Sequence, residues 1–305
     1  MTAPIIALRG VSKSFGRIDA VRNLDLALYP GECVGLVGHN GAGKSTIIKL
    51  MLGLLRPTSG AVETLGEDPA AGAAARARRE LGYLPESVAL YPSMTGRETL
   101  AFYAHLKGQP VRANAALLNR VGLGQAAKRR VGTYSKGMRQ RLALAQAILG
   151  QPRALLLDEP TTGLDPALRQ SFYEIVREMR QSGAAILLSS HALTELEGEV
   201  DRVVVMNRGR KMADGSILEL RQLAGIGVRV RLRVPQGMTP GLEALRDWTP
   251  LHGGVLETRC DESRILGQLR ALPDWAEDVE VLRPSLDEIY AAFLRREDDV
   301  PRETA

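Results

Sequence analysis

Four patterns of residues, placed in a fixed order along the chain, have the types and spacing that triphosphate chemistry requires. They are GHNGAGKS (38–45), YSKGM (134–138), LLLDEP followed by TGLD (155–165), and His191 after a pair of serines. The first pattern alone is weak, since a G-x-x-x-x-G-K-[ST] match needs a strand before it and a helix after it. Taken together, the ordered set predicts a protein that binds and hydrolyses ATP.

The glycine-rich pattern supplies donors for a polyphosphate. Its glycines allow backbone N–H groups to point inward around an anion, and the following helix aims its positive end at the same place. Lys44 adds a mobile positive charge for the outer phosphates, and the Ser45 hydroxyl is placed to bind Mg²⁺. The alternative is a glycine-rich turn that only joins a strand to a helix, and the complete motif with both flanks disfavours it. The expected nucleotide contacts are Gly38, His39, Asn40, Gly41, Ala42, Gly43, Lys44, Ser45 and Thr46.

Two acidic residues follow a later apolar segment. Residues 154–157 are apolar, so Asp158 should emerge at the carboxyl edge of a sheet, where ligands of open α/β sheets bind. We expect Asp158 to hold Mg²⁺ through water and Glu159 to orient and polarise the attacking water. An Asp-Glu pair after a strand is usually a cap or a turn, but TGLD and His191 downstream favour the catalytic interpretation.

The elements that must position these groups follow from hydrophobic spacing. An apolar run at 33–37 predicts a buried strand before the phosphate loop, and an apolar stripe predicts a helix over 46–55. Residues 96–122 carry helical patterns and predict a helical insert at about 87–150. Beyond the insert, helices and strands alternate, which favours an α/β fold with a parallel sheet covered by helices. The other elements predicted here are strands at 5–11, 21–28, 154–157 and 184–188 and helices at 135–149 and 167–181.

A domain boundary is predicted near 222–227, where LAGIG interrupts the pattern. The chain would then comprise a large unit, 1–222, and a small α/β unit, 223–295, in which no catalytic set of residues appears. The charged tail, 296–305, is expected to be disordered. Predicted elements of the small unit are strands at 228–234, 255–258 and 279–282 and helices at 242–246, 262–272 and 286–294.

Composition disfavours several classes of protein. The 305 residues are 45% hydrophobic and 25% charged with a net charge of +5, as in an ordinary globular protein. The excess of Lys and Arg is spread along the chain, so we expect no nucleic-acid partner. The two stretches that are richest in Arg and Lys, 76–79 and 128–130, are expected to be solvated; the alternative is contact with a partner or an anionic surface. Cys33 and Cys260 form no C-x-x-C pair, which disfavours a zinc site or disulfide framework. The N-terminus does not resemble a secretory signal, and no apolar stretch approaches the roughly 20 residues that span a bilayer.

The ordered motifs resemble those of the nucleotide-binding subunit of an ABC transporter, over roughly residues 5–222. This resemblance implies a homodimer that faces head to tail and holds ATP and Mg²⁺ between the phosphate loop of one chain and the YSKGM signature of the other. It also implies that Asp165 bridges the chains, that Phe15 stacks on adenine and that His191 contacts the γ-phosphate. The alternatives are that Phe15 is a core residue and that His191 is a helix N-terminal residue. The signature residues implied at the nucleotide are Ser135, Lys136, Gly137 and Met138, and Ser135 is also expected to start a helix.

Four residues depart from the pattern of many relatives, one of them Tyr134, where the signature of many relatives begins with Leu. Glu86, in GYLPE, stands where the family often has a glutamine that senses Mg²⁺ and reports to a membrane partner; a glutamate can also ligate Mg²⁺. Lys136 and Met138 stand where many relatives have Gly and Gln. We expect Lys136 to add positive charge near the opposing nucleotide, while Ser135 and Gly137 keep the signature contacts.

The cargo leaves weaker traces in the sequence. PSLDEIYAAF (284–293) resembles the tails of exporter-type ATPases. Residues 83–108 with GHNGAGKS are similar to the ATPase of the copper-handling ABC system that helps mature nitrous oxide reductase, which implies a transporter of copper or sulfur species. The resemblance implies a cytoplasmic location, peripheral on the inner face of the membrane, a separate membrane permease and a periplasmic accessory protein reached through it. The alternatives are the ATPase of a drug or lipid exporter, and an ABC protein acting on nucleic acid or ribosomes. The latter would require a second cassette, a long coiled-coil insertion or cysteine-rich zinc modules, which this sequence lacks.

Overall fold

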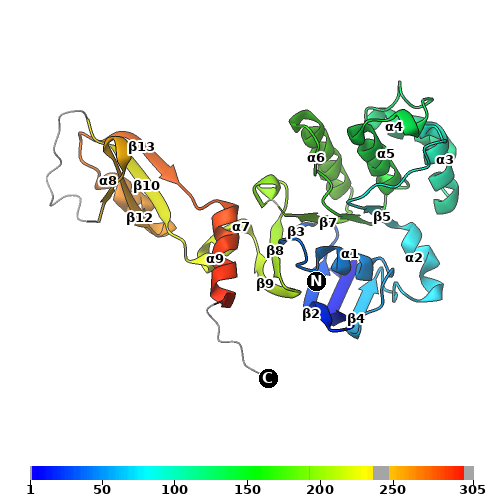
Figure 1. Cartoon of the computed structure of the whole chain (residues 1–305), viewed down its shortest axis with the longest axis horizontal. Coiled ribbons are helices and arrows are strands. Elements are labelled where there is room, and N and C mark those ends of the chain that lie inside the picture. Colours follow the sequence, from blue (N-terminus) through cyan, green and yellow to red (C-terminus); the bar gives the residue numbers. More distant parts are fainter. Residues whose placement is uncertain (1, 192, 236–246, 299–305) are drawn as a thin grey trace. The chain divides into compact units, whose positions relative to one another are not determined.

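The computed structural model describes residues 2–191, 193–235 and 247–298 (Figure 1). The chain divides into two compact units, residues 1–216 and 217–305, each described by itself. Among the described residues, no helix has both the length and the apolar character that crossing a membrane requires.

Two sheets build the larger unit (Figure 1). The smaller sheet is antiparallel with the order β2-β1-β4, and the larger has the order β5-β6-β7-β3-β8-β9, parallel except for β9. Strands β3, β6 and β7 are buried along their whole lengths, as expected for parallel strands covered on both faces. The strands are β1 Ile6–Phe15, β2 Ile18–Leu28, β3 Cys33–Val37, β4 Ser59–Thr64, β5 Leu81–Leu84, β6 Ala154–Leu157, β7 Ala185–Ser190, β8 Arg202–Asn207 and β9 Arg210–Gly215.

Three longer helices form the insert between β5 and β6, seen in green and cyan in Figure 1. The first of them, α3, begins with a capping box in which Thr95 and Glu98 each accept a hydrogen bond from the other's backbone N–H. The helices of this unit are α1 Lys44–Met51, α2 Ala75–Arg79, α3 Gly96–Lys107, α4 Asn114–Arg120, α5 Lys136–Ile148 and α6 Pro166–Gln181, with 3₁₀ turns at Gly72–Ala74, Val111–Ala113, Val131–Thr133 and Leu193–Leu196.

The main hydrophobic core lies where α1 meets both sheets. Ile47, Ile48, Leu50 and Met51 of α1 are fully buried and pack with apolar residues of β1, β2, β3 and β8. The broad apolar stripe that predicts a helix in this segment is therefore the surface by which α1 is fixed beneath the phosphate loop.

The smaller unit has an antiparallel sheet with the order β11-β12-β10-β13. β10 alternates buried apolar residues with arginines, and each arginine forms an ion pair with a carboxylate of α9, β12 or β13. Its elements are α7 Ile217–Ala224, β10 Val228–Arg233, β11 Thr249–Pro250, β12 Val255–Cys260, α8 Ile265–Arg270, β13 Glu277–Leu282 and α9 Leu286–Asp298, with 3₁₀ turns at His252–Gly254 and Glu262–Arg264.

Several boundaries differ from the predictions. The larger unit ends at Ser216 rather than at 222, because α7 contacts α9 within the smaller unit. Helix α1 spans Lys44–Met51 rather than 46–55, since Gly53 has a φ of +71° that ends the helix. Helix α9 continues to Asp298, so the first residues of the predicted tail are helical, and 299–305 lie outside the described residues. The predicted helix at 242–246 also lies outside them.

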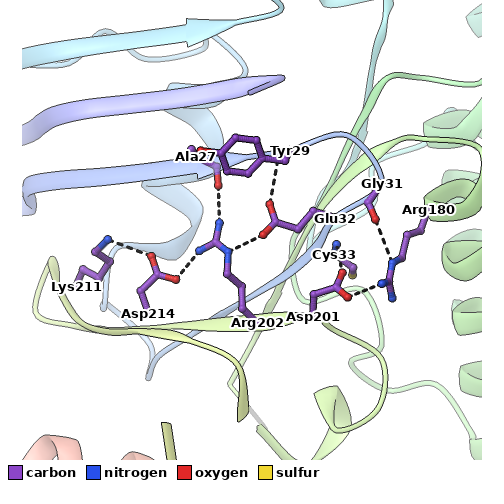
Figure 2. A network of polar contacts seen from close by, with 10 residues as sticks. All are labelled: Ala27, Tyr29, Gly31, Glu32, Cys33, Arg180, Asp201, Arg202, Lys211 and Asp214. Carbon is purple, nitrogen blue, oxygen red and sulfur yellow. Dashed lines mark hydrogen bonds and ion pairs between the residues drawn. The ribbon is translucent and has the colours of Figure 1, made fainter. Parts of the chain in front are cut away.

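A polar network holds the amino end of β3 and the strands around it (Figure 2). Arg202, the first residue of β8, donates to Glu32 (Nε to Oε1, 2.7 Å), to Asp214 and to the carbonyl oxygen of Ala27. Lys211 also pairs with Asp214, at 3.1 Å. Burial disfavours the charged form of Arg202, yet the hydrogen bonds and charges of Glu32 and Asp214 raise its pKa overall.

The second half of this network surrounds the first residue of β3. Asp201 accepts a hydrogen bond from the Cys33 backbone N–H (2.9 Å) and pairs with Arg180, whose Nε donates to the Gly31 carbonyl oxygen (3.1 Å) (Figure 2). Burial, aided by the charge of Asp201, raises the pKa of the Cys33 thiol to about 12. Cys33 is thus a protonated core residue at neutral pH.

Candidate functional site

The phosphate loop joins β3 to α1 and is tightly packed at both ends. A Cβ at Gly38 would lie 2.7 Å from the Met206 carbonyl oxygen, and one at Gly43, where φ is +103°, would lie 2.4 Å from the Ala20 carbonyl oxygen. At Gly41, in the middle of the loop, no atom would lie within 4 Å of a Cβ. The loop therefore has fixed ends and an open middle at a helix N-terminus, which is the form of an anion-binding cradle.

Lys44 is the first residue of α1 and is only 6% exposed. Its Nζ donates to the Gly38 carbonyl oxygen (2.6 Å) and lies 3.2 Å from Glu159 Oε1. The ammonium group is thus held inside the loop, between the phosphate cradle and a buried carboxylate.

Asp158 and Glu159 follow β6 and are both buried, at 3% and 7% exposure. Glu159 has a φ of +48°, a left-handed conformation that is uncommon for residues other than glycine and that clusters at functional sites. The Ser189 hydroxyl, from β7, joins the two residues: it donates to Asp158 Oδ1 (2.7 Å) and accepts from the Glu159 backbone N–H (2.9 Å). The strained residue is therefore supported by a neighbouring strand.

The two carboxylate oxygens of Glu159 have different surroundings. Oε2 lies 2.6 Å from His191 Nδ1, whereas Oε1 faces Lys44 and accepts no hydrogen bond from any described residue. A buried carboxylate oxygen without a hydrogen bond is costly in a purely structural role. This oxygen retains the acceptor capacity that positioning a water molecule requires.

A cleft of about 820 Å³ opens beside the phosphate loop. Phe15 lines it with a side chain that is 46% exposed and has Lys13 Nζ 5.1 Å from its ring centroid, so Phe15 is not a core residue. Glu86 lines the same cleft. The structure thus brings together most of the residues predicted from the sequence: Phe15, His39, Asn40, Gly41, Ala42, Gly43, Lys44, Ser45, Thr46, Glu86 and Glu159.

Several residues that line or brace this cleft are not marked by any sequence motif. Three arginines line it: Arg17 and Arg208 come from turns and Arg22 from within β2, and no motif marks any of them. The β8–β9 turn also braces the loop, because His39 Nε2 lies 2.6 Å from Asn207 Oδ1 and the Gly209 N–H donates to the Ala42 carbonyl oxygen (3.1 Å). For Ser189 the sequence offers one indication of a role in the site: it belongs to the pair of serines that directly precedes His191.

The signature residues lie apart from this cleft. Ser135 caps α5 by accepting from the Met138 backbone N–H (3.2 Å), and Asp165 caps α6 by accepting from the Leu168 N–H (2.9 Å). None of Ser135, Lys136, Gly137, Met138 and Asp165 is among the described residues that line the cleft.

The donor set fits a nucleoside triphosphate with Mg²⁺. The cradle and Lys44 supply N–H donors and a cation for the phosphates, and Phe15 supplies an exposed aromatic side chain in the same cleft for a base. The Ser45 hydroxyl, the Asp158 carboxylate and the Glu86 carboxylate are hard oxygen ligands of the kind that Mg²⁺ prefers.

Comparison with known proteins agrees with this geometry. Residues 21–162 match the family described as ABC transporter. The chain is 40% identical over 222 residues to an uncharacterized ABC transporter ATP-binding protein of Bacillus subtilis (strain 168), covering 72% of this chain and 73% of that protein. It is 35% identical over 307 residues to the daunorubicin resistance ATP-binding protein DrrA3 of Streptomyces coeruleorubidus, covering 95% and 96%. It is also 35% identical over 312 residues to the mouse ATP-binding cassette sub-family A member 7, but spans only 14% of that protein's length.

Solved structures show the same architecture. An ATP binding subunit of an ABC transporter superposes with a TM-score of 0.68 at 32% identity, over 72% of this chain and 93% of that one. A dimeric bacterial ABC transporter cassette gives a TM-score of 0.65 over 70% and 98% of the two chains; at 23% identity this likeness concerns the fold alone.

Proposed function

The chain belongs to the ABC transporter family and is an ABC-type ATPase, and we propose that it binds ATP with Mg²⁺ to energise an exporter of drug-like or lipid-like molecules. The observation that carries the catalytic part is the buried Glu159 carboxylate, which lies between Lys44 and His191. The cradle places the triphosphate, and Lys44 neutralises its outer phosphates. When bound, Mg²⁺ would spread the charge that develops on the transferred phosphoryl group; Ser45, Asp158 and Glu86 would hold it.

Within the site, each proposed role matches a contact of this chain. Glu159 would orient the attacking water through Oε1, while His191, at Oε2, would hold the carboxylate and reach the γ-phosphate. Ser189 keeps Asp158 and Glu159 in a fixed relation by bonding both. Positioning and electrostatics account for most of phosphoryl-transfer catalysis, so this fixed geometry matters more than proton transfer.

We propose that two copies of the chain complete the site. Ser135, Lys136, Gly137, Met138 and Asp165 lie outside the cleft of their own chain, which supports their use at the cleft of a second copy facing head to tail. Ser135 opens α5, whose N-terminal end favours an anion. Phe15, at the cleft of its own chain, would stack on the base.

The exporter assignment rests on the relatives. One, matched over nearly its whole length, is described as a daunorubicin resistance protein, another as a Nod factor export protein and a third as a phospholipid-transporting ATPase. Nothing in these names bears on copper, so the assignment to the copper-handling system for nitrous oxide reductase stays a prediction, as does a periplasmic accessory protein. A role on nucleic acid or ribosomes is favoured by none of the observations.

A separate permease, and a position at the inner face of the membrane, complete the proposal. Closing and opening of the two copies would move that permease through the helical insert, α3 to α5. We expect crosslinks from residues around 87–107 to reach a membrane chain when the complex is intact. Crosslinks that never form in an active complex would exclude this route.

The test is purification of the tagged chain together with the membrane protein that binds it, followed by ATP hydrolysis in lipid nanodiscs. Hydrolysis that increases with an anthracycline or a phospholipid, and not with Cu⁺, would support the exporter. Stimulation by Cu⁺ alone, with copper found in a partner, would support the narrower prediction instead. Absence of any hydrolysis by the folded complex would contradict the ATPase assignment itself.

A further inference from the structure

The loop that joins β6 to α6, residues 158–165, is held by the helix that begins in the signature. Gln140 of α5 is buried, and its Nε2 donates to the Pro160 carbonyl oxygen (3.0 Å). Lys136, one helical turn earlier, lies over Gly163: a Cβ at Gly163 would lie 2.6 Å from Lys136 Nζ and 3.3 Å from its Cε. Residues four apart share one face of a helix, so a single face of α5 contacts the loop at two places.

These contacts bear on the position of the catalytic carboxylate, because the contacted residues follow Glu159 closely in the chain. Glu159, with its φ of +48°, immediately precedes Pro160, and Gly163 also has a positive φ, +76°. Residues in such conformations persist only when their surroundings over-determine them. The loop that carries Glu159 therefore depends on outside contacts for its shape.

Other contacts of the loop come from residues outside the signature helix. The Thr161 hydroxyl donates to Glu195 (2.7 Å), and Glu195 also pairs with Arg169 of α6 at 3.0 Å. Ser189 accepts from the Glu159 N–H. Lys136 and Gln140 are thus the contacts of this loop that come from the signature helix.

We propose that Lys136 and Gln140 are positioning residues for the 158–165 loop of their own chain, so that the signature helix helps to set the Glu159 carboxylate. This inference rests on the proposed ATPase function and differs from a direct electrostatic role of Lys136 at the opposing nucleotide. A positioning role lowers kcat at every salt concentration, whereas the effect of an exposed charge at the opposing nucleotide weakens as salt screens it. The exposed Lys136 side chain reaches Gly163 because it is long. An arginine side chain is long enough to make the same contact, and an alanine side chain is not.

The test compares kcat and KM for ATP hydrolysis by the full chain, in its complex with the membrane subunit, for Lys136→Ala, Lys136→Arg and Gln140→Leu. Matched controls are Lys128→Ala and Gln170→Leu, which change exposed residues of the insert and of α6. We expect kcat to fall about tenfold in Lys136→Ala and Gln140→Leu with KM within about twofold, since small displacements of a positioned group cost rates of this order. Lys136→Arg should restore kcat, and the controls should match the wild type.

Three results would overturn the proposal: an unchanged kcat in folded Lys136→Ala, a KM that rises with kcat unchanged and that depends on salt, or failure of Lys136→Arg to restore kcat. If Gln140→Leu does not fold, the two variants of the exposed Lys136 test the proposal without it. Wild-type protein without ATPase activity would instead contradict the proposed function, because the positioning test presupposes measurable turnover.

Discussion

The two ends of β3 differ in how their polar groups are satisfied. At the amino end, Arg202 donates hydrogen bonds to two carboxylates and a backbone carbonyl oxygen of the same chain. Asp201 accepts from a backbone N–H and pairs with Arg180 (Figure 2). At the carboxyl end, Lys44 and Glu159 are buried more deeply and pair with each other, yet Glu159 Oε1 accepts no hydrogen bond from the described residues and the Glu159 backbone is strained. Charges whose hydrogen bonds are made within the chain indicate an architectural role, whereas a buried carboxylate that keeps one oxygen free of hydrogen bonds, on a strained backbone, indicates a chemical one.

This contrast predicts that substitutions at the carboxyl end change function more than stability, and that those at the amino end do the reverse.

The largest expected effect on ATP affinity is that of Lys44→Ala. Removing a charge-assisted contact to phosphate should weaken ATP binding by roughly 10- to 100-fold. Isothermal titration calorimetry measures it, with Lys49→Ala, an exposed lysine of the same helix, as the control. ATP binding as tight as that of the wild type would contradict a functional role for the carboxyl end of β3.

Ser189→Ala should act on the rate rather than on binding. The substitution leaves Asp158 Oδ1 and the Glu159 N–H without their shared partner, so we expect kcat to fall about tenfold with the ATP dissociation constant little changed. Steady-state hydrolysis measures this, with Ser171→Ala on α6 as the control. A normal kcat would show that the two carboxylates hold their places without this bridge.

Arg202→Met should lower stability and leave the nucleotide site intact. Glu32 and Asp214 would lose their shared cation while still largely buried, which should cost about 2–3 kcal/mol of unfolding free energy after allowance for partial exposure. Chemical denaturation measures the loss, and Arg177→Met, at a more exposed pair, should cost less than about 1 kcal/mol. A large loss of ATP affinity in folded Arg202→Met would contradict the division of roles.

The smallest effect concerns Cys33. Since its pKa is raised to about 12, the folded thiol keeps its proton at pH 8 and should resist alkylation by iodoacetamide, whereas the half-buried Cys260 should react faster. Above about pH 9 an unfolded Cys33 loses its proton while the folded one keeps it, so this residue's contribution to stability falls as pH rises. Mass spectrometry after timed labelling checks the order of reaction, and rapid labelling of Cys33 in folded protein would show that the amino end of β3 is open.

Much of the site could be predicted because its determinants are local. Glycines, a lysine and a hydroxyl at fixed spacing define the phosphate cradle, and a short apolar run before Asp158 places the carboxylates at a sheet edge. The N-cap Ser135, expected to start a helix, likewise depends on a neighbour three residues away. Periodicity gave the strands β3, β6 and β7 and the helices α5 and α6 to within one or two residues.

What could not be predicted depends on contacts between distant segments. The bridge by Ser189, the hydrogen bond from Gln140 to Pro160 and the tie between His39 and Asn207 join residues 20 to 168 positions apart. The strands β8 and β9 also went unpredicted. They belong to the sheet because β8 pairs with β3 and β9 pairs with β8, and the local sequence pattern does not specify either pairing.

The central claim is that Glu159, at the carboxyl end of β3's sheet, orients the water that attacks ATP. Glu159→Gln keeps the size of the side chain and one acceptor oxygen but removes the charge, so the most direct test measures ATP binding and single-turnover hydrolysis on the same Glu159→Gln preparation. We predict binding close to that of the wild type and a chemical step slowed by roughly 100-fold or more. A chemical step at the wild-type rate, with ATP bound normally, would contradict the account.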